Sequence, residues 1–230
     1  MNATIQRLIR LAPLSLGCSI ALTLLQFPGL AQITRATIAD IVGGDRVYIE
    51  QTQAYIRDLA EFGEEVSTED TRAQLDFDNG AAGRLQRFSN VQIGQCVEVQ
   101  DGTLVASGPI DGCVSGFLVR VEGTIFTIDR ATNTATSDIK TLEGQVELVT
   151  QNNPNPSNPV LIPAGQKVSV RPGQPLSSIV PQPMTKGEYC SIIRGDLFQG
   201  FRNPLPNEDR LEEVVVRLYG SPCDTFPVIW

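Results

Sequence analysis

The sequence predicts a mainly β protein that ends in a short helical segment. The clearest β signal lies in residues 142–148, where Leu142, Val146 and Leu148 alternate with polar side chains, a period of two typical of a strand with one buried face. Similar short apolar runs occur elsewhere in the chain. They are separated by turn signals, such as Asn79-Gly80 and the Asn- and Pro-rich residues 151–159. Near the C-terminus the apolar spacing instead follows a helix.

Residues 32–170 are expected to form one β domain of short strands. A Gly-Gly-Asp turn at 43–45 separates the first two strands, and the Asn-Gly pair at 79–80 predicts a two-residue hairpin turn. The Asp-Gly pair at 101–102 predicts a second tight turn with a strand returning after it. The apolar side changes phase at Gly123, which predicts a bulge or a sharp bend there.

Helical spacing of apolar residues occurs in two places. Residues 52–62 are short and ambiguous, with spacing that fits successive helical turns at Tyr55, Ile56, Leu59 and Phe62. Residues 171–183 contain four prolines, too many for a paired strand or a helix interior, and are predicted to be a linker. Residues 184–230 are then predicted to form a small helical module, in which Thr185 and Glu188 have the spacing of a capping box and a second helix follows.

The N-terminus predicts export. Arg7 and Arg10 precede the apolar residues 11–27, and small residues follow, so residues 1–31 are predicted to be a signal peptide that is cleaved after Ala31. The alternative is an uncleaved membrane anchor, although the apolar run is at the short limit for spanning a bilayer. We therefore expect a periplasmic or extracellular protein with no membrane span after cleavage.

The charge and composition exclude several classes of function. Removing residues 1–31 would leave 16 of the 18 basic residues and all 26 acidic ones, a net charge of −10. Because such a surface repels a phosphate backbone, nucleic acid is not expected as a partner. The chain contains no histidine, which argues against Ser-His and Cys-His catalysis and against a zinc site. We expect neither a metal nor a cofactor.

Four cysteines remain after cleavage, and an even number in an exported chain points to disulfide bonds. Four cysteines allow three pairings. The favoured pairing joins Cys96 to Cys113 and Cys190 to Cys223. These two bonds close the shortest loops, and each stays within one predicted module.

Four blocks of sequence resemble the FecR-type domain, a periplasmic module named after the iron-citrate signalling regulator. The blocks are residues 64–80, 119–128, 142–148 and 162–170, and together they extend over residues 36–170. The resemblance implies an all-β fold similar to a β-roll or β-helix. It also implies a non-catalytic role in envelope signalling or protein interaction, with no catalytic residues to carry over.

The chain departs from that family in three respects. Glu122 stands where the family commonly has Arg before Gly-Thr, and the excursion between Cys96 and Cys113 is not typical. The signalling members hold a sigma factor with a cytoplasmic tail. Only about ten residues precede the apolar segment here, so a regulator of that kind is not expected.

Carboxylates and aromatic residues are the remaining candidates for a site. Two pairs of carboxylates are each expected on one face of a strand: Asp76 with Asp78, and Glu143 with Glu147. Such pairs could catalyse the hydrolysis of a sugar, but the favoured interpretation is that they lie on a solvent-exposed face of the sheet. The aromatic residues of the C-terminal module could form an exposed patch that binds sugar or protein, or they could pack in the core of that module. Core packing is favoured. These residues are Tyr189, Phe198, Phe201 and Trp230.

These observations predict an exported, non-catalytic binding or scaffold protein and not an enzyme. Its expected partner is an envelope or extracellular protein, contacted through exposed strand edges and turns. The alternative is a polysaccharide-binding protein or a carboxylate-dependent carbohydrate-active protein.

Overall fold

A computed structural model describes residues 33–131 and 134–223, so the predicted signal peptide and Trp230 lie outside the described residues. The described chain is mainly β, as predicted. Its strands form one continuous hydrogen-bonded set arranged in two rows, which are joined because the long strand β9 belongs to both. Neighbouring strands pair antiparallel except for β9 and β10, which pair in parallel.

We call the two rows the helix-covered row and the open row. In order, the helix-covered row consists of β4 (Leu59–Glu61), β1 (Arg35–Val42), β6 (Arg72–Phe77), β7 (Ala82–Leu85), β9 (Val97–Gly108), β12 (Thr124–Arg130), β13 (Ser137–Glu143), β16 (Gln166–Val170) and β17 (Gln182–Pro183). The open row consists of β3 (Thr52–Gln53), β2 (Val47–Ile49), β5 (Glu65–Thr68), β8 (Asn90–Gln92), the start of β9, β10 (Gly112–Val114), β11 (Phe117–Val121), β14 (Gln145–Thr150) and β15 (Val160–Pro163).

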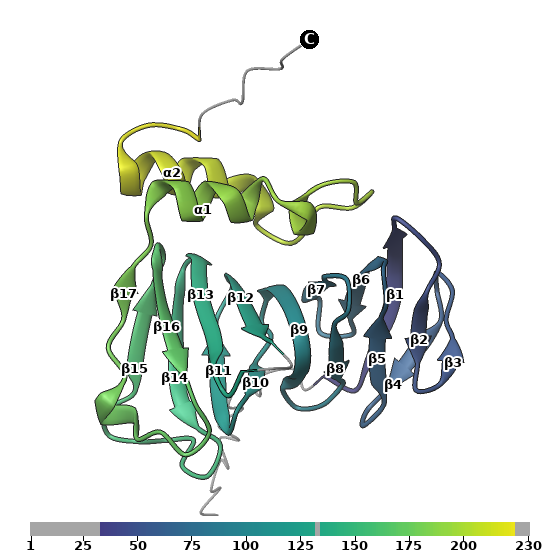
Figure 1. The fold of residues 1–230 in the computed structure, drawn as a ribbon, viewed down its shortest axis with the longest axis horizontal. Helices are drawn as coiled ribbons and strands as arrows, with labels where there is room; N and C mark the ends of the chain where they lie inside the picture. Colours follow the sequence, from purple (N-terminus) through teal and green to yellow (C-terminus); the bar gives the residue numbers. More distant parts are fainter. Residues whose placement is uncertain (1–32, 132–133, 224–230) are drawn as a thin grey trace, which may run out of the picture.

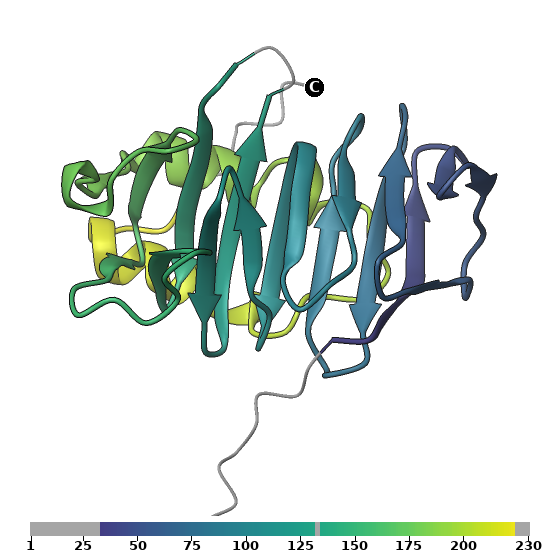
Figure 2. The same cartoon turned by 90° about the horizontal axis from the view of Figure 1, so that it is seen from below.

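The main hydrophobic core lies between the two rows. Leu75, Leu104 and Phe126 enter it from the helix-covered row, and Val66 and Val119 enter it from the open row, all fully buried. Successive residues of a strand point to opposite faces, so alternate residues of each strand supply this core. In the part of the chain that the structure describes, no helix covers the outer face of the open row, as Figure 2 shows from below.

The helices α1 (Lys186–Ile193) and α2 (Leu211–Tyr219) cover the outer face of the other row (Figure 1). The outward-facing Val105 and Leu142 form a second buried cluster with Tyr189 and Val215 from the helices. The hydroxyl of Tyr189 donates a hydrogen bond of 2.5 Å to the carbonyl of Leu142. The C-terminal segment is therefore packed against the β domain as a further layer and shares a core with it.

The predicted proline-rich linker is more ordered than the sequence suggested. It contains a 3-10 turn, Leu176–Ser178, and ends in β17, which pairs with β16. Proline lacks an N–H group, which excludes it from central strands but not from an edge position such as that of Pro183. The prediction that this segment could not contain a paired strand was wrong for that reason.

The helix ends agree closely with the sequence signals. Thr185 is the N-cap of α1 and its hydroxyl accepts a hydrogen bond from the Glu188 backbone N–H. The Glu188 carboxylate, the other half of the predicted capping box, binds the Lys167 ammonium at 2.8 Å. Gly220 ends α2 with a φ of +76°.

Glycines at positive φ lie where the chain passes between the rows. Gly123 has a φ of +67° and separates β11 of the open row from β12 of the covered row, which confirms the predicted sharp bend. Gly144, with a φ of +77°, similarly separates β13 from β14. Residues 142–148 are thus two strands in different rows, and Leu142 faces the helices while Val146 faces the main core.

Two of the predicted turns differ from expectation. The Asn79 hairpin joins β6 and β7 as predicted, but the Phe77 N–H bonds the Ala81 carbonyl, so its loop has three residues with only Gly80 at positive φ. At Gly102 the chain does not return: β9 continues through it, with a φ of +75°, from one row into the other.

The two disulfides have the favoured sequential pairing. Cys96–Cys113 joins the start of β9 to its parallel neighbour β10. Cys190–Cys223 joins α1 to the residues that follow α2. The first bond thus lies within the strand set, and the second links the two ends of the helical segment.

Candidate protein-binding surface

The predicted carboxylate pairs do not form a common acidic site. The side chain of Asp78 accepts hydrogen bonds from the backbone N–H and the hydroxyl of Thr34, which lower the pKa of Asp78, whereas exposed Asp76 accepts one from Gln74. Both aspartates thus have local structural partners.

The second predicted pair is divided between the two rows. Glu143 lies on β13 and pairs with Arg210 at 3.6 Å, whereas Glu147 lies on β14 and pairs with Arg120 at 3.5 Å. Each carboxylate is engaged by a different arginine on a different element. The spacing in the sequence suggested one face because it does not reveal the passage between rows at Gly144.

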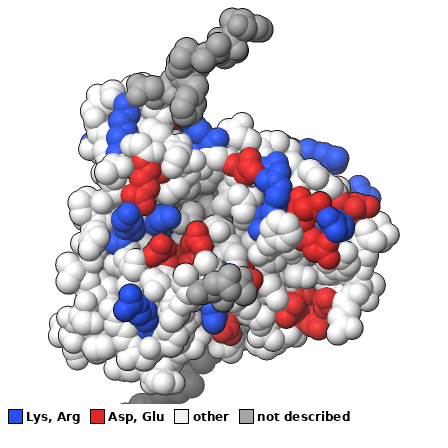
Figure 3. All heavy atoms as spheres, viewed as in Figure 1, with Lys and Arg blue, Asp and Glu red and all other residues white. Residues whose placement is uncertain are grey.

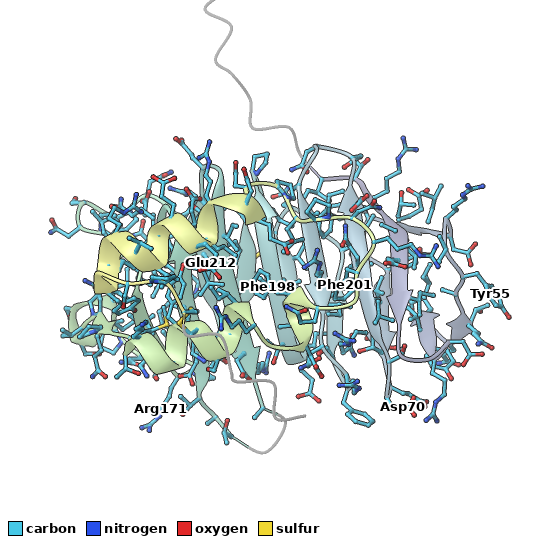
Figure 4. The ribbon with its side chains drawn as sticks, turned by 90° about the horizontal axis from the view of Figure 1, so that it is seen from above. Tyr55, Asp70, Arg171, Phe198, Phe201 and Glu212 are labelled. Atoms are coloured by element: carbon cyan, nitrogen blue, oxygen red, sulfur yellow. A yellow bond between two sulfur atoms is a disulfide. The ribbon has the colours of Figure 1, made fainter. Side chains whose placement is uncertain are left out.

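The predicted aromatic patch is not a single exposed surface. Tyr189 is fully buried, which confirms core packing for that residue. Phe198 and Phe201 lie over the helix-covered row, beside α1 and α2, in Figure 4. Phe201 covers the guanidinium of Arg84 at 4.4 Å and that of Arg72 at 5.4 Å from its ring centre.

Arg84 on β7 is the centre of a polar cluster under the C-terminal segment. Its side chain is 1% exposed and forms an ion pair of 2.9 Å with Glu208. It also donates hydrogen bonds to the side chain of Gln74 and to the carbonyls of Leu197 and Asn203. Burial lowers the pKa of Arg84, and the carboxylate of Glu208 opposes that shift. Since every contact is internal, the cluster fixes the C-terminal segment on the sheet.

An exposed group of large apolar side chains lies at one end of the molecule. Tyr55, Ile56, Leu59 and Phe62 are 61, 37, 47 and 55% exposed, and we call them the apolar edge patch. Figure 4 shows Tyr55 at the extreme end of the molecule, away from the helices. Single exposed apolar residues are common, but four within eight residues form the kind of surface that marks an interaction site.

The patch coincides with the terminal strands of both rows. Within the described residues, β4 pairs with β1 only and β3 pairs with β2 only, so both rows end here. Edge strands present backbone groups that a partner chain can pair with. A shallow hollow of about 480 Å³ lies beside the patch, lined by Ile49, Glu50, Thr52, Gln53, Ala54, Asp58, Leu59 and Glu64.

Acidic side chains surround the apolar edge patch. Residues 50–65 contain five acids and one basic residue, Arg57, and a second arginine, Arg35, lies opposite Glu61 on β1. On the face seen in Figure 3, acidic side chains gather over the β1–β5 end with a few basic ones among them. The surface combines apolar area with net negative charge.

The sequence left the structure of this segment ambiguous. The spacing of its four apolar residues suggested a helix, whereas the structure has two short strands with a turn between them at Ile56-Arg57. Nothing in the local sequence distinguishes these exposed side chains from the buried face of an amphipathic helix, which also carries charged residues on its other face.

Two further properties of the described residues bear on other classes of site. Within residues 33–131 and 134–223, no three His, Cys, Asp or Glu residues are grouped so that they could hold a metal ion. In the same part of the chain no helix has the length and apolar character needed to cross a membrane.

Comparison with known proteins gives limited similarity. No protein family matches the sequence, and no curated protein matches it. Two crystal structures of a candidate anti-sigma factor from Parabacteroides distasonis ATCC 8503 are similar, with TM-scores of 0.46 and 0.45 and identities of 14% and 13%. The matches cover 57% and 56% of this chain, and this chain spans 65% and 64% of theirs, slightly under two thirds.

Proposed function

We propose that this protein is an exported, non-catalytic binding protein with a FecR-type domain that contacts another envelope or extracellular protein. The four sequence blocks that resemble FecR domains support the family assignment, and a β-roll-like path of the chain agrees with the two facing rows of short strands. The two disulfides are compatible with an oxidising compartment outside the cytoplasm.

One observation carries the proposal: large apolar side chains remain in solvent where both rows of strands end. Exposing four such residues costs hydrophobic free energy that the chain would recover on burying them against a partner. Arg84 and each of the four carboxylates discussed above have an internal partner, although the Oε2 atom of Glu143 has none. Binding through the apolar edge patch is therefore the role that the described surface supports best.

Photo-crosslinking in cells tests this proposal. A photoreactive phenylalanine replaces Phe62 in the patch, and the matched control replaces Phe88, a comparably exposed aromatic residue on the β7–β8 loop. We expect position 62 to give a defined adduct with an envelope protein and position 88 to give none. No adduct at position 62, or the same adducts at both positions, would reject the apolar edge patch as the binding surface.

A further inference from the structure

We infer that the partner contributes an extended, positively charged and partly apolar segment, which pairs with the backbone of Leu59 on β4. This inference rests on the proposed function, since it specifies how the apolar edge patch is occupied. Three features of the described residues carry it: the direction of the backbone groups on β4, the contrast with the opposite end of the rows, and the local charge.

The first feature is the hydrogen-bond pattern between β1 and β4. Ile38 bonds this segment with both of its backbone groups, since its N–H donates to the Asp58 carbonyl and its carbonyl accepts from the Arg57 N–H. Bonding alternates along an antiparallel strand, so the next residue of β1 that bonds β4 is Ala36, opposite Ala60. Leu59 lies between these two positions, and its N–H and carbonyl therefore point away from β1 toward the open edge.

The neighbouring residue shows how short this opening is. The Glu61 N–H donates to the Glu64 carboxylate at 2.8 Å, and the Glu61 carbonyl accepts from the Glu64 N–H at 3.1 Å. Among residues 33–131 and 134–223, the chain thus closes this edge at Glu61 and leaves it open at Leu59. A partner strand would gain two backbone hydrogen bonds at Leu59, flanked by the apolar side chains of Tyr55 and Phe62.

The second feature is that the opposite end is protected against strand addition. There the terminal strands β15 and β17 contain Pro163 and Pro183, and a proline cannot donate to an added strand. Neither β3 nor β4 contains a proline. The two ends of the rows therefore differ in the way expected if only one of them receives another chain.

The third feature is charge, which decides between a second copy and a different partner. The five acids of residues 50–65, offset by Arg57 and Arg35, leave a net charge of −3 around the patch. Two copies meeting through this end would bring like charges together, whereas a basic segment would gain attraction and faster association. The occupant that fits is a segment with Lys or Arg interleaved among apolar residues, in the alternation of a β-strand.

Selection from a phage-displayed library of random ten-residue peptides tests the inference on the purified protein. We expect enriched peptides to carry net positive charge with alternating apolar residues. Leu59→Pro removes the outward N–H but no bond to β1, and we expect it to weaken binding of an enriched peptide about tenfold, the value of one typical hydrogen bond. Leu59→Val keeps the N–H and is the matched control, expected to bind within about twofold of the parent.

Charge reversal forms the second arm. Glu61→Lys reverses the charge of an exposed side chain that lies opposite Arg35 on β1, and we expect it to weaken binding several-fold at low salt and less at high salt. Circular dichroism checks that each variant is folded. A further measurement needs no variant. We expect the backbone amide of Leu59 to exchange its hydrogen more slowly in the peptide complex than in the free protein.

Each of the other outcomes overturns the inference. Enriched peptides that are acidic or indifferent to Glu61→Lys would reject the charge argument, and an unprotected Leu59 amide would reject strand pairing. A concentration-dependent dimer in solution that Leu59→Pro abolishes would make a second copy the occupant. If no peptide is enriched while position 62 still crosslinks a protein in cells, this binding mode fails and the proposed function stands; if both fail, the proposed function fails too.

Discussion

The substitution Glu208→Gln tests whether the buried Arg84 cluster holds the C-terminal segment on the sheet. It removes the carboxylate that lies 2.9 Å from a guanidinium only 1% exposed, and leaves that charge with neutral acceptors. Removing one partner of a buried ion pair typically costs about 3–5 kcal/mol. Glu208 is itself 21% exposed and Arg84 keeps the carbonyls of Leu197 and Asn203, so we expect a cost of about 2–3 kcal/mol.

The assay is urea unfolding followed by circular dichroism. With a urea m-value of about 2 kcal/mol/M, the midpoint should fall by about 1–1.5 M. Glu212→Gln is the matched control, because Glu212 on α2 is 57% exposed and 3.8 Å from Arg194 (Figure 4). An exposed pair of that kind contributes about 0.5 kcal/mol or less. Equal midpoints for the two variants, or a larger loss for Glu212→Gln, would refute the assignment of Arg84 as the central clamp.

Three further substitutions test other parts of the fold. Tyr189→Phe leaves the buried Leu142 carbonyl without its 2.5 Å donor and should cost about 1–2 kcal/mol in urea unfolding; an unchanged midpoint would mean that the bond does not form. Gly144→Ala should destabilise more than Gly123→Ala, because both have positive φ but only the Cβ at 144 would lie 2.9 Å from the Thr124 hydroxyl; similar losses would contradict that close contact. Burial raises the pKa of Asp111, so its ionisation opposes folding as the pH rises through that pKa. Asp111→Asn should therefore raise the urea midpoint at pH 7 and not at pH 3, and a gain of equal size at both pH values would disprove the effect.

The sequence predicted local structure well wherever one face of a segment is buried and the other is wet. The cap at Thr185 and the bend at Gly123 follow from backbone hydrogen bonding and the left-handed conformation, which are local properties. The pairing of the four cysteines was also the favoured one, because loop length is readable from the sequence.

What the sequence did not reveal depends on contacts between distant segments. A glycine at positive φ can close a hairpin, as Gly80 does, or let a strand continue into another row, as Gly102 does, and only the partners of the flanking strands decide which. The role of Arg84 likewise depends on Glu208, which lies 124 positions away. The structure of the apolar edge patch stayed ambiguous because its residues are exposed, and the spacing of apolar residues reports which face of a segment is buried.

The central claim is that the end formed by β3 and β4 is the surface through which the protein binds its partner. Co-purification of the tagged protein from the cell envelope tests it most directly, with Tyr55→Ser combined with Phe62→Ser as the patch variant and Phe88→Ser as the exposed aromatic control. We predict that the parent and the Phe88→Ser protein recover the same envelope protein and that the patch variant, although folded, does not. Recovery of that protein by the patch variant at the parental level would contradict the claim.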